Sequence, residues 1–119
     1  MLAEQMGLAE QPAQALARRH GLAVVVTLGG SGALAFTPGG DWSIGALAVK
    51  AVDTTGAGDA FTGTLAAAID GGAPLPDALR RASVAAGLSC TLEGAQPSLA
   101  DAAAVDRRLD DLAPAVRLN

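Results

Sequence analysis

The chain is organised around one short stretch, Asp53-Thr54-Thr55-Gly56-Ala57-Gly58-Asp59-Ala60-Phe61. This stretch joins a strand-like run at 47–52 to an apolar helical pattern that begins at Ala60. Its two glycines, Gly56 and Gly58, permit a tight turn and the close approach of a ligand to the backbone. The start of the helix would then present free N–H groups and a partial positive charge, which together bind anions and phosphate above all.

A carboxylate, Asp59, falls in the first turn of that helix, beside the free N–H groups. This combination suits phosphoryl transfer, because the N–H groups stabilise charge on the transferred group while the carboxylate accepts a proton from the attacking hydroxyl. Asp is also a common capping residue, so a single Asp near a helix start would indicate only a cap. The complete frame from Asp53 to Asp59 favours the catalytic interpretation.

The composition predicts one packed domain and excludes several kinds of site. Half of the 119 residues are hydrophobic and 17% are charged, which favours a core over disorder. A net charge of −4 with 3% aromatic residues argues against nucleic-acid binding. A single cysteine, Cys90, and a single histidine exclude an internal disulfide and a Cys/His zinc site. We expect Cys90 to be a buried small hydrophobe in a reducing, cytoplasmic compartment, with no membrane partner and no signal peptide.

The pattern along the chain is that of an α/β protein. A continuous apolar and β-branched run at 22–28 predicts a strand buried on both faces, as in a parallel sheet. A hairpin comes next, with strands expected at 33–37 and 42–49. Helices are expected at these places: the tail of one at 1–8, then 12–20, 60–70, 75–92 and about 98–112.

Two familiar phosphate-binding motifs are excluded by their context. Gly30-Ser31-Gly32-Ala33-Leu34-Ala35 matches the dinucleotide pattern G-x-G-x-x-A, which requires a helix to follow. The turn residues at 38–40 leave room only for a short strand. The only lysine, Lys50, follows no Walker A loop. Any phosphate recognition must therefore depend on backbone N–H groups and a metal ion.

The stretch at 53–61 closely resembles the second signature of the ribokinase (PfkB) family of carbohydrate kinases. Two more segments resemble the same family: 27–32, which in the family lies against the nucleotide, and Gly94-Ala95-Gln96-Pro97-Ser98, a loop that helps to bind a monovalent cation. The resemblance implies a ribokinase-like three-layer α/β/α sandwich that is incomplete. Residues 1–119 would be its C-terminal portion, with the nucleotide-binding and catalytic-base part, and the N-terminal sugar and lid part would be absent.

The resemblance also implies an activity, the ATP-dependent phosphorylation of a sugar hydroxyl with Asp59 as general base. Ribose is the expected substrate, and fructose or another sugar or nucleoside is the alternative. The implied anion hole consists of the N–H groups of Gly56, Ala57, Gly58 and Asp59. The implied nucleotide-binding residues are Thr27, Leu28, Gly29, Gly30, Ser31, Gly32, Gly58, Asp59 and Ser83.

Two metal ions accompany this activity in the family. Mg²⁺ would bridge the phosphates of ATP. A monovalent cation, K⁺, would be held mostly by backbone carbonyls, by residues that match the family's ligands in position: Asp53, Thr55, Ser89, Leu92, Gly94 and Ser98. The family usually has a proline soon after the last of these, where this chain has Leu99-Ala100. This departure bears on the shape of the loop.

A second hypothesis is a non-catalytic remnant that binds nucleotide weakly or only self-associates. A doubly buried strand at 22–28 would have unpaired edges in a chain without the N-terminal part. The expected partner is then a second copy of the chain or the missing N-terminal part.

Overall fold

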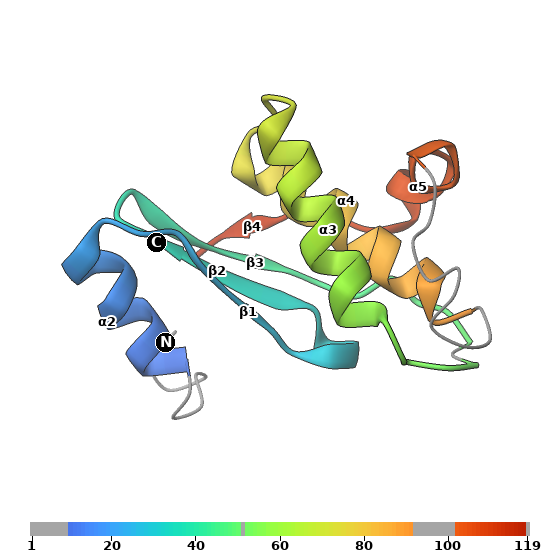
Figure 1. Cartoon of the computed structure of the whole chain (residues 1–119), viewed down its shortest axis with the longest axis horizontal. Helices are drawn as coiled ribbons and strands as arrows, with labels where there is room; N and C mark the ends of the chain where they lie inside the picture. The colour runs from blue at the N-terminus through green and yellow to red at the C-terminus, as the bar shows by residue number, and fades with distance from the viewer. Residues whose placement is uncertain (1–9, 51, 92–101, 119) are drawn as a thin grey trace.

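The computed structural model describes residues 10–50, 52–91 and 102–118 (Figure 1). The elements in chain order are α2 (Glu10–His20), β1 (Val24–Thr27), a 3₁₀ turn (Gly29–Ser31), β2 (Ala33–Thr37), β3 (Gly40–Ile44), α3 (Ala57–Asp70), α4 (Leu75–Ser89), α5 (Ala102–Arg108), a second 3₁₀ turn (Leu109–Asp111) and β4 (Val116–Arg117). The expected helix tail at 1–8 lies outside the described residues. No helix in the described ranges has the length and apolar character needed to cross a membrane.

The described strands form one antiparallel sheet in the order β1-β2-β3-β4. The expected hairpin is confirmed, with Ala35 of β2 opposite Trp42 of β3. Its second strand was expected to reach residue 49 but ends at Ile44, and 45–50 has no regular secondary structure. The strand expected at 22–28 is shorter and only half-buried, and its described partner is antiparallel. The short connection at 28–32 accounts for this, because parallel neighbours need a much longer crossover.

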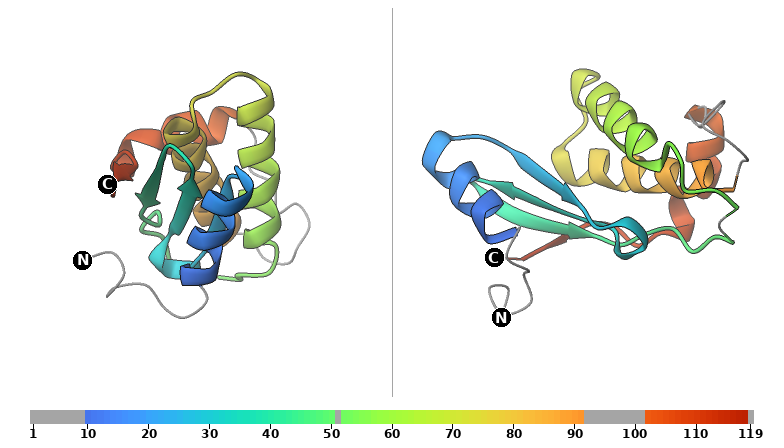
Figure 2. Two further views of the ribbon diagram at one scale, coloured as in Figure 1. Left: turned by 90° about the vertical axis from the view of Figure 1, so that its left-hand side faces the viewer. Right: turned by 60° about the horizontal axis from the view of Figure 1, so that its bottom comes forward.

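Side chains that alternate along the strands contribute to two separate apolar clusters, one on each face of the sheet. Ala33 and Ala35 point to the face that packs against α3 and α4, whereas Leu34 and Phe36 point to the face that packs against Ala17 of α2. Helices therefore cover both faces of the sheet (Figures 1 and 2). This is the expected three-layer α/β/α arrangement, over the part of the chain that the structure describes.

A buried polar contact ties α2 to the hairpin. Asp41 of β3 is fully buried, and its Oδ2 accepts hydrogen bonds from Gln14 Nε2 at 2.7 Å and Arg18 Nη2 at 3.0 Å. Burial of a charge is costly unless it is paired and hydrogen-bonded. The contact therefore specifies how α2 lies on the sheet, and it joins residues more than twenty positions apart.

Helices α3 and α4 pack closely because α4 carries small residues on its inner face. Ala78, Ala82 and Ala85 are fully buried there. Helix α3 begins at Ala57, three residues earlier than expected, and α4 ends at Ser89 rather than near residue 92. The last helix was expected at about 98–112; α5 and the 3₁₀ turn that follows it occupy 102–111, and 98–101 lie outside the described residues.

Candidate active site

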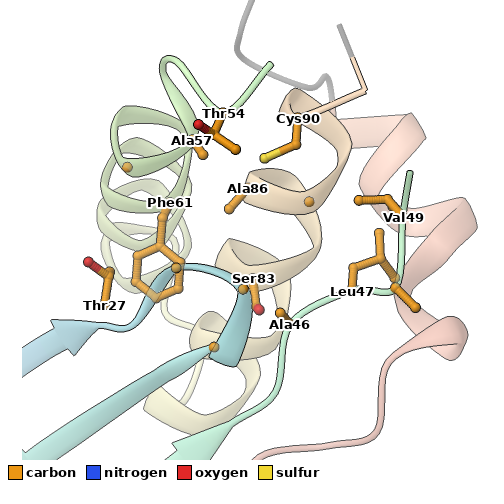
Figure 3. A pocket seen from close by; sticks show the side chains of 16 residues that line it. Thr27, Ala46, Leu47, Val49, Thr54, Ala57, Phe61, Ser83, Ala86 and Cys90 are labelled. Atoms are coloured by element: carbon orange, nitrogen blue, oxygen red, sulfur yellow. The ribbon is translucent and has the colours of Figure 1, made fainter. Parts of the chain in front are cut away.

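A cavity of about 620 Å³ opens between the helix pair, the turn after β1 and the segment at 45–49. Figure 3 shows Phe61 and Thr27 on one side of this region, Ser83 and Ala86 of α4 in the middle, and Leu47 on the other side. None of the described residues that line the cavity carries a charge. Such a lining suits an uncharged, flat portion of a ligand.

The first turn of α3 lies at this cavity. Gly56 is the N-cap residue with a φ of +86°, a conformation that glycine adopts without steric cost. In the described chain, the N–H groups of Gly58 and Asp59 have no hydrogen-bond acceptor, as is normal for the start of a helix. The N–H of Ala57 donates to the Thr54 carbonyl at 3.2 Å, so one of the four amides expected in the anion hole is already engaged.

The side chain of Asp59 is exposed in the same turn. Gly58, next to it, is exposed and lines the cavity. The turn is therefore open to a ligand rather than enclosed in the core. Free amides at a helix start can bind a phosphate group, and an exposed carboxylate in the same turn can accept a proton.

The turn after β1 supplies a further part of the cavity lining. Most of the residues expected there line the cavity, namely Thr27, Gly29, Gly30 and Gly32, whereas Leu28 and Ser31 do not. The backbone of the turn is closed on itself, since the Leu28 N–H donates to the Gly32 carbonyl at 2.8 Å. A strand and not a helix comes after it, so the exclusion of a dinucleotide-binding motif is confirmed.

Ser83 lies in the cavity wall, as a nucleotide-binding residue should, but its hydroxyl is engaged elsewhere. The residue is 4% exposed, and its Oγ donates a hydrogen bond to the carbonyl of Gly45 at 2.5 Å. The group expected to contact adenine therefore holds the backbone that follows β3.

Part of the expected cation site comes together where the stretch before α3 meets the end of α4. The N–H groups of Val52 and Asp53 both donate to the carbonyl of Cys90, at 2.7 and 3.0 Å. Asp53 Oδ1 accepts the N–H of Thr55 at 2.8 Å, and Ser89 lies immediately before Cys90, with its Oγ bonded to the Ala86 carbonyl at 2.9 Å. The other expected ligands, Leu92, Gly94 and Ser98, lie outside the described residues.

The carbonyl, carboxylate and hydroxyl oxygens at this junction are ligands of the kind that hard cations prefer. Among the residues described, no three His, Cys, Asp or Glu side chains are grouped to hold a metal ion. A cation at this junction would therefore depend on carbonyl and hydroxyl oxygens with the single carboxylate of Asp53.

One wall of the cavity was missed by the sequence-based interpretation. It consists of 46–49, which were expected in a strand, and Gly87 of α4. Cys90 was expected to be buried, but it is half-buried and lines the cavity (Figure 3). Hydrophobic periodicity carries no signal for this wall, because the wall depends on how an irregular segment packs against a distant helix.

The comparisons with known proteins agree with one another. The model of the family described as pfkB family carbohydrate kinase matches residues 2–102. Ribokinase from Schizosaccharomyces pombe is 39% identical over 85 residues, which are 71% of this chain and 27% of that protein.

Solved structures show the same relationship. Arabidopsis thaliana ribokinase complexed with ribose and ATP superposes with a TM-score of 0.74 at 39% identity, over 84% of this chain and 34% of that one. A fructokinase double mutant from Vibrio cholerae, with bound fructose, ADP and potassium ion, superposes with a TM-score of 0.76 at 35% identity, over 88% and 36%. The architecture is thus part of a ribokinase fold.

The chain spans 25–32% of the length of the curated ribokinases that it matches. The residues that the family model matches include the stretch at 53–61 and the two helices α3 and α4. The chain belongs to the pfkB family of carbohydrate kinases.

Proposed function

We propose that this chain provides the nucleotide-binding and catalytic-base portion of an ATP-dependent sugar kinase. The observation that carries the proposal is the first turn of α3, where Ala57 and Gly58 line an uncharged cavity. In the same turn, the N–H groups of Gly58 and Asp59 have no acceptor among the described residues, and the Asp59 side chain is exposed although it does not line the cavity. The cavity suits the base and ribose of the nucleotide, and the helix start suits its phosphates.

In the proposed reaction, Asp59 accepts the proton of a sugar hydroxyl as its oxygen attacks the γ-phosphorus of ATP. The new sugar O–P bond forms while the bond from that phosphorus to the β,γ-bridging oxygen breaks, and ADP leaves with the electron pair. The N–H groups at the start of α3 stabilise the charge on the transferred group, which is the main task of a protein in this chemistry. When bound, Mg²⁺ would neutralise charge on the phosphate oxygens.

The substrate we propose is ribose, with fructose as the alternative. The relatives that support this include a ribokinase complexed with ribose and ATP and a fructokinase with bound fructose and ADP. A potassium ion is present in the second of these, and we place a monovalent cation, K⁺, at the junction of Asp53, Thr55 and Ser89.

The exchange of Asp59 for asparagine tests the base directly. We expect Asp59→Asn to lower sugar-dependent ADP release by roughly 10²–10⁴-fold, the usual contribution of general base catalysis, because an amide cannot accept the proton. ADP binding, measured by calorimetry, should change little. Asp70→Asn is the matched control, since Asp70 is an exposed residue at the other end of the same helix.

The outcomes separate the two hypotheses. Turnover by the Asp59→Asn variant near that of the unchanged chain would refute the base assignment. If the unchanged chain binds ADP without turnover on ribose or fructose, the nucleotide-binding remnant is supported instead. If it binds no ADP at all, the nucleotide site itself is wrong.

We infer that the chain by itself also self-associates or pairs with a further portion of a ribokinase fold, through β1. This strand is at the edge of the described sheet and consists of four uncharged residues, Val24-Val25-Val26-Thr27. Natural edge strands usually carry charges, prolines or bulges that prevent pairing with another chain. Light scattering during size-exclusion chromatography should show oligomers, and a sharp monomer with a cooperative thermal transition would contradict the inference.

A further inference from the structure

We infer that Ser83 is a positioning residue, which fixes the cavity wall at 46–49 to α4 through the hydrogen of its hydroxyl group. The identity of the ligand, a nucleotide, rests on the proposed function. The contact between Ser83 and the wall rests on the geometry alone. The Ser83 hydroxyl has one donor hydrogen, and it is used on the carbonyl of Gly45 at 2.5 Å. The bond spans 38 positions of sequence and is part-buried.

The position of Gly45 gives this bond its importance. Strand β3 ends at Ile44, so the ladder of the sheet holds the backbone up to that residue and no further. Beyond it, residues 45–50 and 52–54 belong to no helix or strand. A hydrogen bond to the first carbonyl after the strand therefore sets the direction in which 46–49 leave the sheet.

One turn further along α4, Gly87 provides the second point of contact. A Cβ atom at this position would lie 2.7 Å from the Cβ of Leu47, closer than real Cβ contacts come. Leu47 is 5% exposed and belongs to the main apolar cluster. Residues four apart lie on one face of a helix. Ser83 and Gly87 thus hold the wall at two points, the first through a hydrogen bond and the second because it has no side chain.

The wall lines the same uncharged cavity as Ala57 and Gly58 at the start of α3. Ala46, Leu47, Ala48 and Val49 all line it. A wall that moves would change how well the cavity fits the base of the nucleotide, with Asp59 and the free amides left in place. The expected signature is a change in nucleotide KM with kcat preserved.

The first experiment measures amide hydrogen exchange at 46–49 in the chain without ligand. Ser83→Ala should raise exchange there, because it removes the hydroxyl that holds the preceding carbonyl. Ser43→Ala is the control, since Ser43 is a half-buried serine of β3 that does not line the cavity. If Ser83→Ala leaves exchange at 46–49 unchanged, the positioning role is refuted, whether or not the chain binds nucleotide.

The second experiment measures ADP affinity by calorimetry. Loss of one hydrogen bond should weaken ADP binding by roughly two- to tenfold in Ser83→Ala. Gly87→Ala leaves the Ser83 hydroxyl in place, but its added Cβ would clash with Leu47, so this variant should weaken ADP binding as well. A direct contact with the base predicts a different result: Ser83→Ala would weaken ADP binding without any change in exchange at 46–49.

A matched pair covers the case in which Ser83→Ala does not fold. Ser83→Thr and Ser83→Val add nearly the same volume, but only threonine retains a donor. We expect slower exchange at 46–49 and tighter ADP binding for Ser83→Thr than for Ser83→Val. Equal behaviour of the two would overturn the inference. Absence of ADP binding in the unchanged chain would instead refute the proposed function. The hydrogen-exchange experiment would then still test whether Ser83 positions residues 46–49.

Discussion

Two glycine-rich turns border the cavity, and they lead into different secondary structure. Gly30-Ser31-Gly32 and Gly56-Ala57-Gly58 have the same spacing, and both contribute lining residues. The first is a 3₁₀ turn whose amides bond to its own carbonyls, such as Gly32 N–H to Gly29 at 3.2 Å, before it enters β2. The second opens a helix of 14 residues.

The difference shows that glycine spacing alone does not make an anion site. Residues 33–37 alternate between the two faces of the sheet, so the chain after the first turn extends and pairs. The residues after the second turn repeat with a helical period, so the N–H groups of Gly58 and Asp59 are left without acceptors in the described chain. Four glycine substitutions test this contrast.

The largest effect is expected for Gly32→Ala in the first turn. An added Cβ would lie 1.9 Å from the backbone oxygen of Ile44, and the residue has a φ of +95°. The clash and the strained backbone should lower the free energy of unfolding by about 3 kcal/mol or more, as measured by urea denaturation. Stability equal to that of the unchanged chain would mean that β3 can move away from this turn.

A smaller loss is expected for Gly56→Ala in the second turn. The N-cap φ of +86° costs an ordinary L-residue roughly 1–2 kcal/mol, and this should appear in the free energy of unfolding. If the variant is as stable as the unchanged chain, the helix can begin without the left-handed residue, and the turn is less constrained than the structure indicates.

Gly58→Ala should weaken ADP binding without lowering the free energy of unfolding. No atom lies within 4 Å of a Cβ built there, and alanine favours a helix by up to about 1 kcal/mol over glycine, so stability should be equal or higher. The methyl group would nevertheless stand on the cavity lining, beside the free amides. We expect ADP affinity, measured by calorimetry, to fall roughly tenfold, or about 1.4 kcal/mol. Unchanged affinity would place the phosphates elsewhere.

The smallest effect is expected for Gly30→Ala. Its φ is not positive, and no atom lies within 4 Å of the added Cβ. Its free energy of unfolding should stay within about 0.5 kcal/mol of the original, as for most surface changes. A large loss of stability here would show that the first turn requires glycine at position 30 as well as at Gly32.

Local patterns predicted those parts of the molecule that depend on neighbours in the sequence. The turn at 38–40 indicated the hairpin, and apolar residues such as Phe61 and Leu79 indicated α3 and α4. The stretch at 53–61 indicated a helix start, and the structure has one. The roles assigned to Asp59 and the cation ligands stay predictions.

Features that join distant segments were missed. Strand β4 has only two residues, and it pairs with β3 where the Arg117 guanidinium lies 5.8 Å from the centre of the Trp42 ring. Asp41 is fully buried and accepts hydrogen bonds from Gln14 and Arg18. None of these contacts has a period or a local motif that could indicate it.

The amino-acid sequence by itself determined the order of the helices and strands from α2 to α5, the family, and the turn that opens α3, because each depends on residues close together in the chain. The tertiary structure alone decided that 46–49 form a cavity wall and that the Ser83 hydroxyl donates its hydrogen bond to the carbonyl of Gly45. The physical reason is that a hydrogen bond across 38 positions forms only after both segments are held by the rest of the core.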